Sequence, residues 1–134
     1  MTSCTVINHY YDADTDTEQY ISTVIEGVFW EDTRAANMRS SGGADGADSI
    51  SVIIPFRASY VKPFKMPQSY AVDPSESWTL RPGDYIVKGA HLFSFDAAGF
   101  REFEKSTDFI HKITKVDTMD FGSKHMQHWE VGGV

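Results

Sequence analysis

The chain has 134 residues, 41% hydrophobic and 13% aromatic, a composition typical of one globular domain covering residues 1–134. Residues 1–50 hold nine acidic and two basic side chains and thus the whole formal charge of −7, while residues 51–134 hold ten of each. No cluster of Lys and Arg accompanies this balance, which argues against tight binding to a nucleic-acid backbone. The acidic half serves either solubility or a wall that repels passing DNA.

The first 32 residues predict a β-hairpin. Thr5–Tyr11 and Gln19–Trp30 are rich in β-branched and aromatic side chains, which favour strands. The polar stretch Asp12–Glu18 between them predicts an Asx-type turn. Gly27 interrupts the second strand and predicts a bulge or a close backbone approach.

Residues 33–48 predict a flexible loop, because three glycines and small side chains leave nothing to bury. The loop is longer than a hairpin requires, and loops of this length are usually functional or disordered. A place in or near a DNA channel is what the resemblance described at the end of this subsection implies for the loop; disorder without a role is the alternative. The residues assigned to this channel loop are Arg34, Arg39, Gly42, Gly43, Asp45, Gly46 and Asp48.

Residues 49–56 alternate apolar and polar side chains, which predicts a strand with one buried face.

Prolines spaced through residues 57–77 predict an extended, non-helical arm. We predict that this arm packs on a neighbouring subunit; the alternative is that it covers its own barrel. The residues assigned to this assembly arm are Tyr60, Lys62, Phe64, Lys65 and Tyr70.

The second half of the chain predicts more strands and one helix. Pro82-Gly83 predicts a tight turn between residues 78–80 and the strand residues 85–87. Asp96 predicts the cap of a short helix that ends near Lys105. Residues 108–117 and 124–131 again have strand character.

With about six strands in total, the sequence predicts a mainly β fold, a small antiparallel β-barrel. The predicted core is formed by Ile50, Val52, Ile54, Phe56, Trp78, Ile86, Ile113 and Trp129.

The sequence proposes no catalytic, cofactor or metal site. Cys4 has no second cysteine to pair with and lies near a terminus that we expect to be frayed. Asp12, Asp14 and Asp16 imitate a calcium loop, but threonines stand where that loop needs Gly and a bidentate Glu. Acidic pairs fall mostly in turns or on polar faces, where carboxylates are ordinarily solvated. We therefore expect neither an enzyme nor a bound cofactor.

Several segments resemble small proteins of tailed-phage and prophage morphogenesis modules. They are Thr23–Trp30, Ala47–Phe56, Trp78–Leu80, Gly83–Gly89, Ile113–Asp117 and Asp120–Val131, the last being the most specific. The chain is similar in size to the head–tail joining, or head-completion, proteins of phages that infect Gram-positive hosts.

The resemblance implies a protein of the virion neck that is assembled in the host cytoplasm. It implies a stopper, a ring-forming subunit with a barrel of the Src-homology-3 kind and a long loop facing the DNA channel. Its partners would be other copies of itself, the adaptor ring above, the tail-side proteins below and the passing DNA, without sequence-specific binding. A tail-terminator or minor capsid protein is one alternative, a cytoplasmic binding module is another, and a hydrolase that uses a pair of carboxylates is a third. No membrane contact and no catalytic residue follow from the resemblance.

Overall fold

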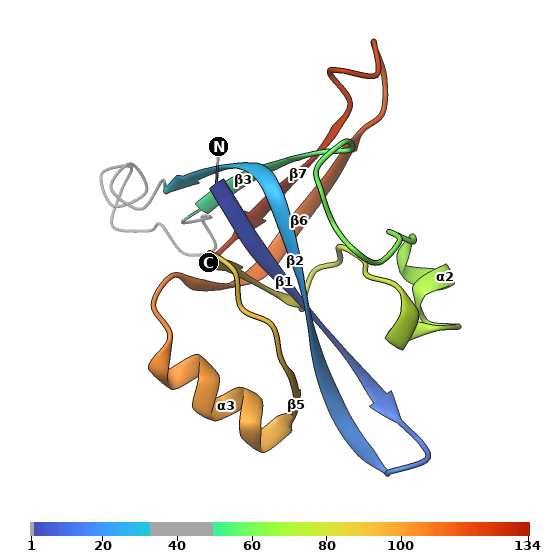
Figure 1. Ribbon diagram of the computed structural model, residues 1–134, viewed down its shortest axis with the longest axis vertical. Helices are drawn as coiled ribbons and strands as arrows, with labels where there is room; N and C mark the ends of the chain where they lie inside the picture. The colour runs from blue at the N-terminus through green and yellow to red at the C-terminus, as the bar shows by residue number, and fades with distance from the viewer. Residues whose placement is uncertain (1, 33–49) are drawn as a thin grey trace.

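The computed structural model describes residues 2–32 and 50–134 and folds them around a closed β-barrel (Figure 1). The strands are β1 (Thr2–Asp12), β2 (Thr17–Asp32), β3 (Ile50–Pro55), β4 (Tyr85–Lys88), β5 (Ser94–Asp96), β6 (Ile110–Met119) and β7 (His128–Gly133). The helical segments are α2 (Pro67–Tyr70), the 3-10 turn η1 (Pro74–Glu76) and α3 (Ala97–Ser106). Six strands close the barrel in the order β1-β4-β6-β7-β3-β2 and back to β1, and β5 extends β2 at its outer edge. All the strand pairings are antiparallel, so the predicted small barrel is confirmed.

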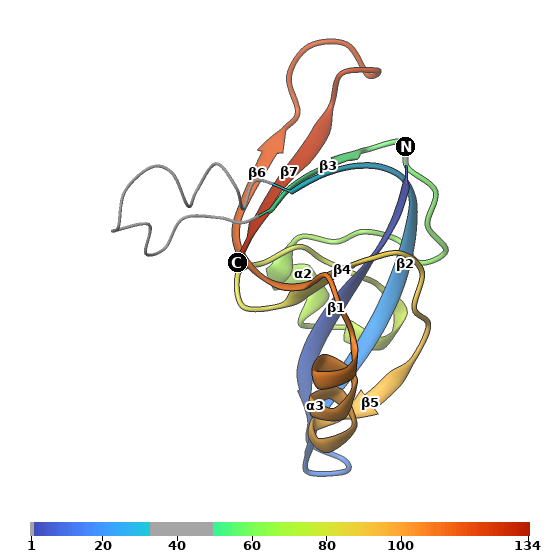
Figure 2. The same ribbon diagram turned by 90° about the vertical axis from the view of Figure 1, so that its left-hand side faces the viewer.

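Strands β1 and β2 form a long twisted hairpin whose closed end projects beyond the barrel (Figures 1 and 2). The Asp14 amide donates to Asp12 Oδ1 at 3.0 Å, which is the predicted Asx turn. Near the other end, the register shifts between Thr2 and Ser3, and Gly27 opposite them has a φ of +90°. Glycine adopts this left-handed conformation without steric cost, so the predicted bulge is confirmed.

The barrel core contains the residues that the alternation in the sequence predicts. All but one of the eight predicted core residues are buried, and Phe56, the exception, is half-buried and packs on Trp129 with ring centroids 4.4 Å apart. Cys4 is fully buried in this core and not at a frayed terminus, since β1 pairs on both sides at that position. Burial raises the pKa of the Cys4 thiol to about 12, which makes it unreactive.

Helix α3 packs against the outer face of the barrel beside β2 and β5 (Figure 2). Asp96 caps it as predicted, by accepting a hydrogen bond of 2.9 Å from the Gly99 amide. The helix buries Phe100 in a second apolar cluster together with Ile7 of β1 and Val87 of β4. No helix in the described ranges 2–32 and 50–134 is long and apolar enough to cross a membrane.

Residues 57–77 correct the prediction of an extended, non-helical arm. The segment contains the helical turns α2 and η1, and each begins with a proline. Proline is tolerated at the first helical position because the amide that it lacks has no intrahelical partner there. Residues 78–80 likewise form no regular strand. The spaced prolines therefore start single helical turns here and do not exclude them.

The glycines at the end of the chain also differ from the prediction. Strand β7 runs through Gly132 to Gly133 and does not stop at Val131. A side chain on Gly133 would meet the Lys112 carbonyl oxygen at 3.0 Å. The glycine is therefore needed for close packing of β7 against β6, and it does not mark the end of the strand.

Candidate functional site

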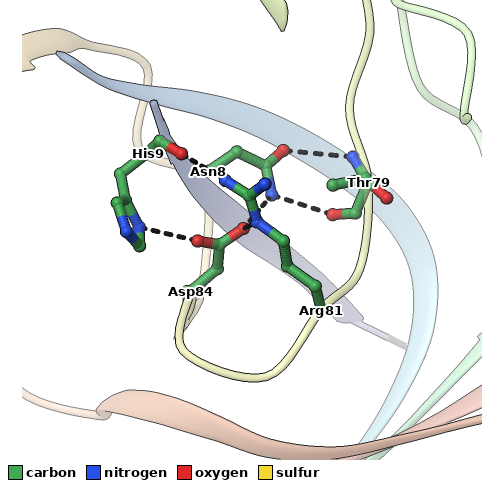
Figure 3. Close-up of polar contacts among 5 residues, drawn as sticks. All are labelled: Asn8, His9, Thr79, Arg81 and Asp84. Carbon is green, nitrogen blue, oxygen red and sulfur yellow. Dashed lines mark hydrogen bonds and ion pairs between the residues drawn. The ribbon is translucent and has the colours of Figure 1, made fainter. Parts of the chain in front are cut away.

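A buried polar cluster centred on Asp84 joins β1 to the turn that precedes β4 (Figure 3). Asp84 Oδ2 accepts hydrogen bonds from Asn8 Nδ2 at 2.8 Å and from Arg81 Nε at 2.7 Å. Asp84 Oδ1 lies 2.7 Å from Nδ1 of His9. The carboxylate is fully buried and therefore depends on these partners in place of water.

The local sequence explains how these groups come together. Gly83 has a φ of +99°, and the Asp84 amide donates to the Arg81 carbonyl oxygen at 3.4 Å, so residues 81–84 form a tight turn. Asn8 donates to the Thr79 carbonyl oxygen at 2.9 Å and accepts from the Thr79 amide at 3.1 Å. The Asn8 side chain thus bonds both main-chain groups of Thr79, as a neighbouring strand would do in a regular sheet. Arg81 also donates to the His9 carbonyl oxygen, which ties the turn to β1.

His9 connects this cluster to the outer surface. Its ring stacks on Tyr20 with centroids 5.3 Å apart, and Tyr20 stacks on Phe100 of α3 at 4.2 Å. The hydrogen bond to Asp84 raises the pKa of His9 above its ordinary value of 6.5, against the opposing effect of burial. Within residues 2–32 and 50–134, no hydroxyl or thiol group is hydrogen-bonded to this ring. The His9 ring therefore links β1 to the turn through Asp84 and, through Tyr20, to α3.

We expect the stability of the protein to fall as the pH rises through the neutral range. A raised pKa means that the folded state binds the proton of His9 more tightly than the unfolded chain does. The stabilisation is complete below 6.5 and is lost as the pH passes the higher folded-state pKa. Melting temperatures measured between about pH 6 and pH 8 should show this slope.

The variant His9→Gln should reduce this slope. The control is His128→Gln, because the Met126 carbonyl oxygen also raises the pKa of His128 in an exposed hairpin far from the cluster. His128→Gln should therefore retain the part of the slope that His9 contributes. An unchanged slope in His9→Gln would contradict the assignment.

A second feature is a groove of about 770 Å³ along the outer edge of β2. Its walls are residues 59–62 on one side and Ala90 and Leu92 on the other. Two apolar residues at the groove are exposed to solvent, Val61 with 97% of its surface and Leu92 with 82%. Such a concave apolar surface, rimmed by Glu26 and Lys62, has the form of an interaction site.

The floor of the groove is an unpaired stretch of sheet edge at Val24. On either side of it, the Ser22 amide donates to the Phe93 carbonyl oxygen at 3.2 Å, and Glu26 and Ser59 exchange hydrogen bonds of 2.9 and 3.0 Å. Because main-chain direction alternates along a strand, the N–H and C=O of Val24 point the same way as those of Ser22 and Glu26. No residue in the described ranges bonds to them on this side. The groove therefore offers one main-chain donor and one acceptor.

A third feature is the tip of the β6–β7 hairpin, residues 120–127, which projects from the barrel at the end opposite the β1–β2 turn (Figure 1). Phe121 and Met126 are 72% and 68% exposed there. The sequence predicts a strand from residue 124, but β7 begins at His128, so this tip is longer than expected. The opposite tip, at the β1–β2 turn, is acidic, with Asp12, Asp14, Asp16 and Glu18.

The structure separates the residues that the sequence assigns to function. The seven channel-loop residues lie outside the described residues. Of the assembly arm, Tyr70 is buried and not exposed as expected, while Tyr60 and Phe64 are half-buried and each lie 5.0 Å from Trp78 between ring centroids. These aromatic side chains cover their own barrel, which is the alternative that the sequence left open. Lys62 and Lys65 are half-buried, and Lys62 lines the groove.

Sequence reasoning missed the Asp84 cluster, the groove and Leu92. The only signal in the sequence was the Arg-Pro-Gly-Asp turn, in which an Asp is ordinarily solvated. Within residues 2–32 and 50–134, no group of three or more His, Cys, Asp or Glu side chains could hold a metal ion.

Comparison with models of protein families matches residues 1–134 to a family described as a family of unknown function (DUF6751). Neither the curated proteins nor the solved structures gave a match.

Proposed function

The chain belongs to the DUF6751 family, and we propose that it is a structural protein of the phage neck. In this proposal it is a stopper, a ring subunit that joins head to tail and closes the DNA channel. The resemblance of its strand segments to phage morphogenesis proteins suggests this role. The small closed barrel is compatible with it, but a barrel alone does not specify a function.

One observation carries the proposal, namely that two exposed apolar surfaces lie on separate parts of one barrel. The first is the groove with Val61 and Leu92, and the second is the hairpin tip with Phe121 and Met126. A soluble monomer rarely exposes large apolar side chains in groups. Rings are built from head-to-tail contacts, which need two different patches on each subunit. The chain presents such a pair.

The remaining surface suits a subunit beside a DNA channel. The acidic β1–β2 tip has four carboxylates and no basic residue between Asp12 and Glu18. A negative surface repels phosphate and would let the duplex slide past without being held. The channel loop predicted at residues 33–48 remains part of this proposal. The partners would be the adaptor ring above and the tail-side proteins below.

A cytoplasmic binding module is the second candidate, and the groove favours it. Its volume of about 770 Å³ lies within the range of small-molecule sites. A module of this kind would use the groove for a ligand and would remain monomeric. The two candidates therefore differ in whether the chain associates with other copies or with a neck complex.

We expect the purified chain to self-associate with increasing concentration or to dock as a ring on a portal–adaptor complex. Light scattering after size-exclusion chromatography would measure the mass against the 15.0 kDa of one chain, and negative-stain images would show rings. A chain that stays monomeric at every concentration and does not dock on the complex would overturn the proposal. It would leave the binding module as the better explanation.

A further inference from the structure

We infer that neighbouring copies contact each other by seating the β6–β7 tip of one copy in the β2-edge groove of the next. This inference rests on the proposed function, since it supplies the contact between subunits of the ring. The tip comprises residues 120–127, and the groove lies between residues 59–62 and 90–92.

The groove requires an extended chain as its occupant. The N–H and C=O of Val24 face the opening between Phe93 and Ser59, which are the nearest main-chain partners along this edge. The distance along β2 from Ser22 to Glu26 is about 13 Å, or four residues at 3.3 Å each. Two or three residues of another chain therefore fit, and they would add to the sheet by main-chain hydrogen bonds.

The hairpin tip supplies such a segment. Asp120 and Phe121 follow β6 directly and lie beyond its last ladder pair, Met119 with His128. Their main chain is therefore available to another strand. Phe121 and Met126 are the apolar side chains that would cover Val61 and Leu92 and remove them from water.

The charged residues of the two surfaces can pair in one orientation of the contact. Glu26 is exposed and Lys62 half-buried at the groove, while the tip carries the exposed residues Asp120 and Lys124. Each surface thus offers one charge of either sign, which fixes orientation more than it adds affinity. The tip projects away from the barrel (Figure 2), and none of its residues lines the groove of its own chain, so a contact between tip and groove joins different copies. Such a contact is head-to-tail and can close a ring.

Two variants that each block one surface test the inference. The groove variant is Val61→Glu with Leu92→Glu, and the tip variant is Phe121→Glu with Met126→Glu. All four side chains are exposed, so both proteins should keep the circular dichroism spectrum and melting temperature of the parent. Each variant alone should remain a monomer. An equimolar mixture should form a heterodimer of twice the 15.0 kDa chain mass and nothing larger, because each variant retains one working surface.

The control variant Ala71→Glu with Val72→Glu adds the same charge at exposed residues away from both surfaces and should assemble like the parent. If either blocking variant alone still forms the parent oligomer, the inferred contact is wrong while the ring proposal stands. If the parent itself neither self-associates nor docks on a portal–adaptor complex, the proposed function fails and the inference fails with it. A parent that docks but never self-associates overturns the inference alone.

Cysteine crosslinking provides an independent readout. Val61→Cys and Phe121→Cys mixed in equal amounts should form a disulfide-linked dimer, since Cys4 is buried and does not compete. Val72→Cys mixed with Phe121→Cys should not. Equal crosslinking in the two mixtures would contradict the contact.

Discussion

Replacing Trp78 with alanine is expected to lower the free energy of unfolding by about 3–5 kcal/mol. Trp78 is fully buried and is the largest side chain among the fully buried residues. Its ring lies 5.0 Å from those of Tyr60 and Phe64 and 5.8 Å from that of Trp129. Its removal would therefore open a cavity and also detach residues 57–77 from the barrel.

Urea unfolding followed by circular dichroism would measure the loss for Trp78→Ala. The matched control is Phe121→Ala, which removes an aromatic ring that is 72% exposed and should change stability by no more than about 0.5 kcal/mol. Equal losses in the two variants would show that residues 57–77 do not depend on Trp78. They would also reopen the hypothesis that this segment packs on a neighbouring subunit.

The fold could be predicted from the sequence where the signal is local. The alternation of Ile50, Val52 and Ile54 defines a buried strand face, and the side chain of Asp96 caps a helix without help from distant residues. The Gly27 bulge is also a local signal, because its positive φ depends on the backbone of that residue alone. These features are present in the structure as expected.

Residues 57–77 show why the rest of the fold could not be predicted. Their prolines exclude a long helix but permit the single turns that begin at Pro67 and Pro74. Tyr70 is buried, and the guanidinium of Arg81 lies 5.1 Å from the centre of its ring. A contact between side chains so far apart in sequence leaves no periodic pattern. The aromatic residues of this segment therefore looked exposed.

The candidate sites have the same limitation. Asn8 and Asp84 are hydrogen-bonded across 76 positions of sequence, and only the barrel brings them together. An Asp after Pro-Gly is usually a solvated turn residue, so its burial depends on β1 covering it. The groove lies between two main-chain partners of β2, Phe93 and Ser59. Because it is formed by the absence of a strand between them, no residue pattern predicts it. Met126 lies in the predicted strand 124–131 and Phe121 lies between two predicted strands, and no periodic pattern indicates that both side chains are exposed.

Asp84→Ala is expected to lower the free energy of unfolding by about 3 kcal/mol, the low end of the range for breaking a buried ion pair. The substitution removes the acceptor of Arg81 Nε, the partner of the His9 ring and one of the two acceptors of Asn8 Nδ2. Water reaches Arg81 and His9, whose side chains are 26% and 32% exposed, and this limits the loss. Urea unfolding at about pH 6, where His9 is protonated, would give the largest difference.

The control Asp117→Ala removes a carboxylate from a surface ion pair, in which Lys115 Nζ lies 3.3 Å from Asp117 Oδ2. Both side chains are exposed, so its loss should be below about 1 kcal/mol.

Asp84→Ala should also abolish the part of the pH slope that His9 contributes, because the hydrogen bond to Asp84 is the main cause of the raised pKa of His9. Asp117→Ala should leave that slope intact. Similar losses from the two substitutions, or an unchanged slope in Asp84→Ala, would mean that the cluster does not hold the turn against β1. If Asp84→Ala instead lowers the free energy of unfolding strongly and abolishes its dependence on pH from His9, the Asp84 carboxylate is the group that links β1, the turn and α3.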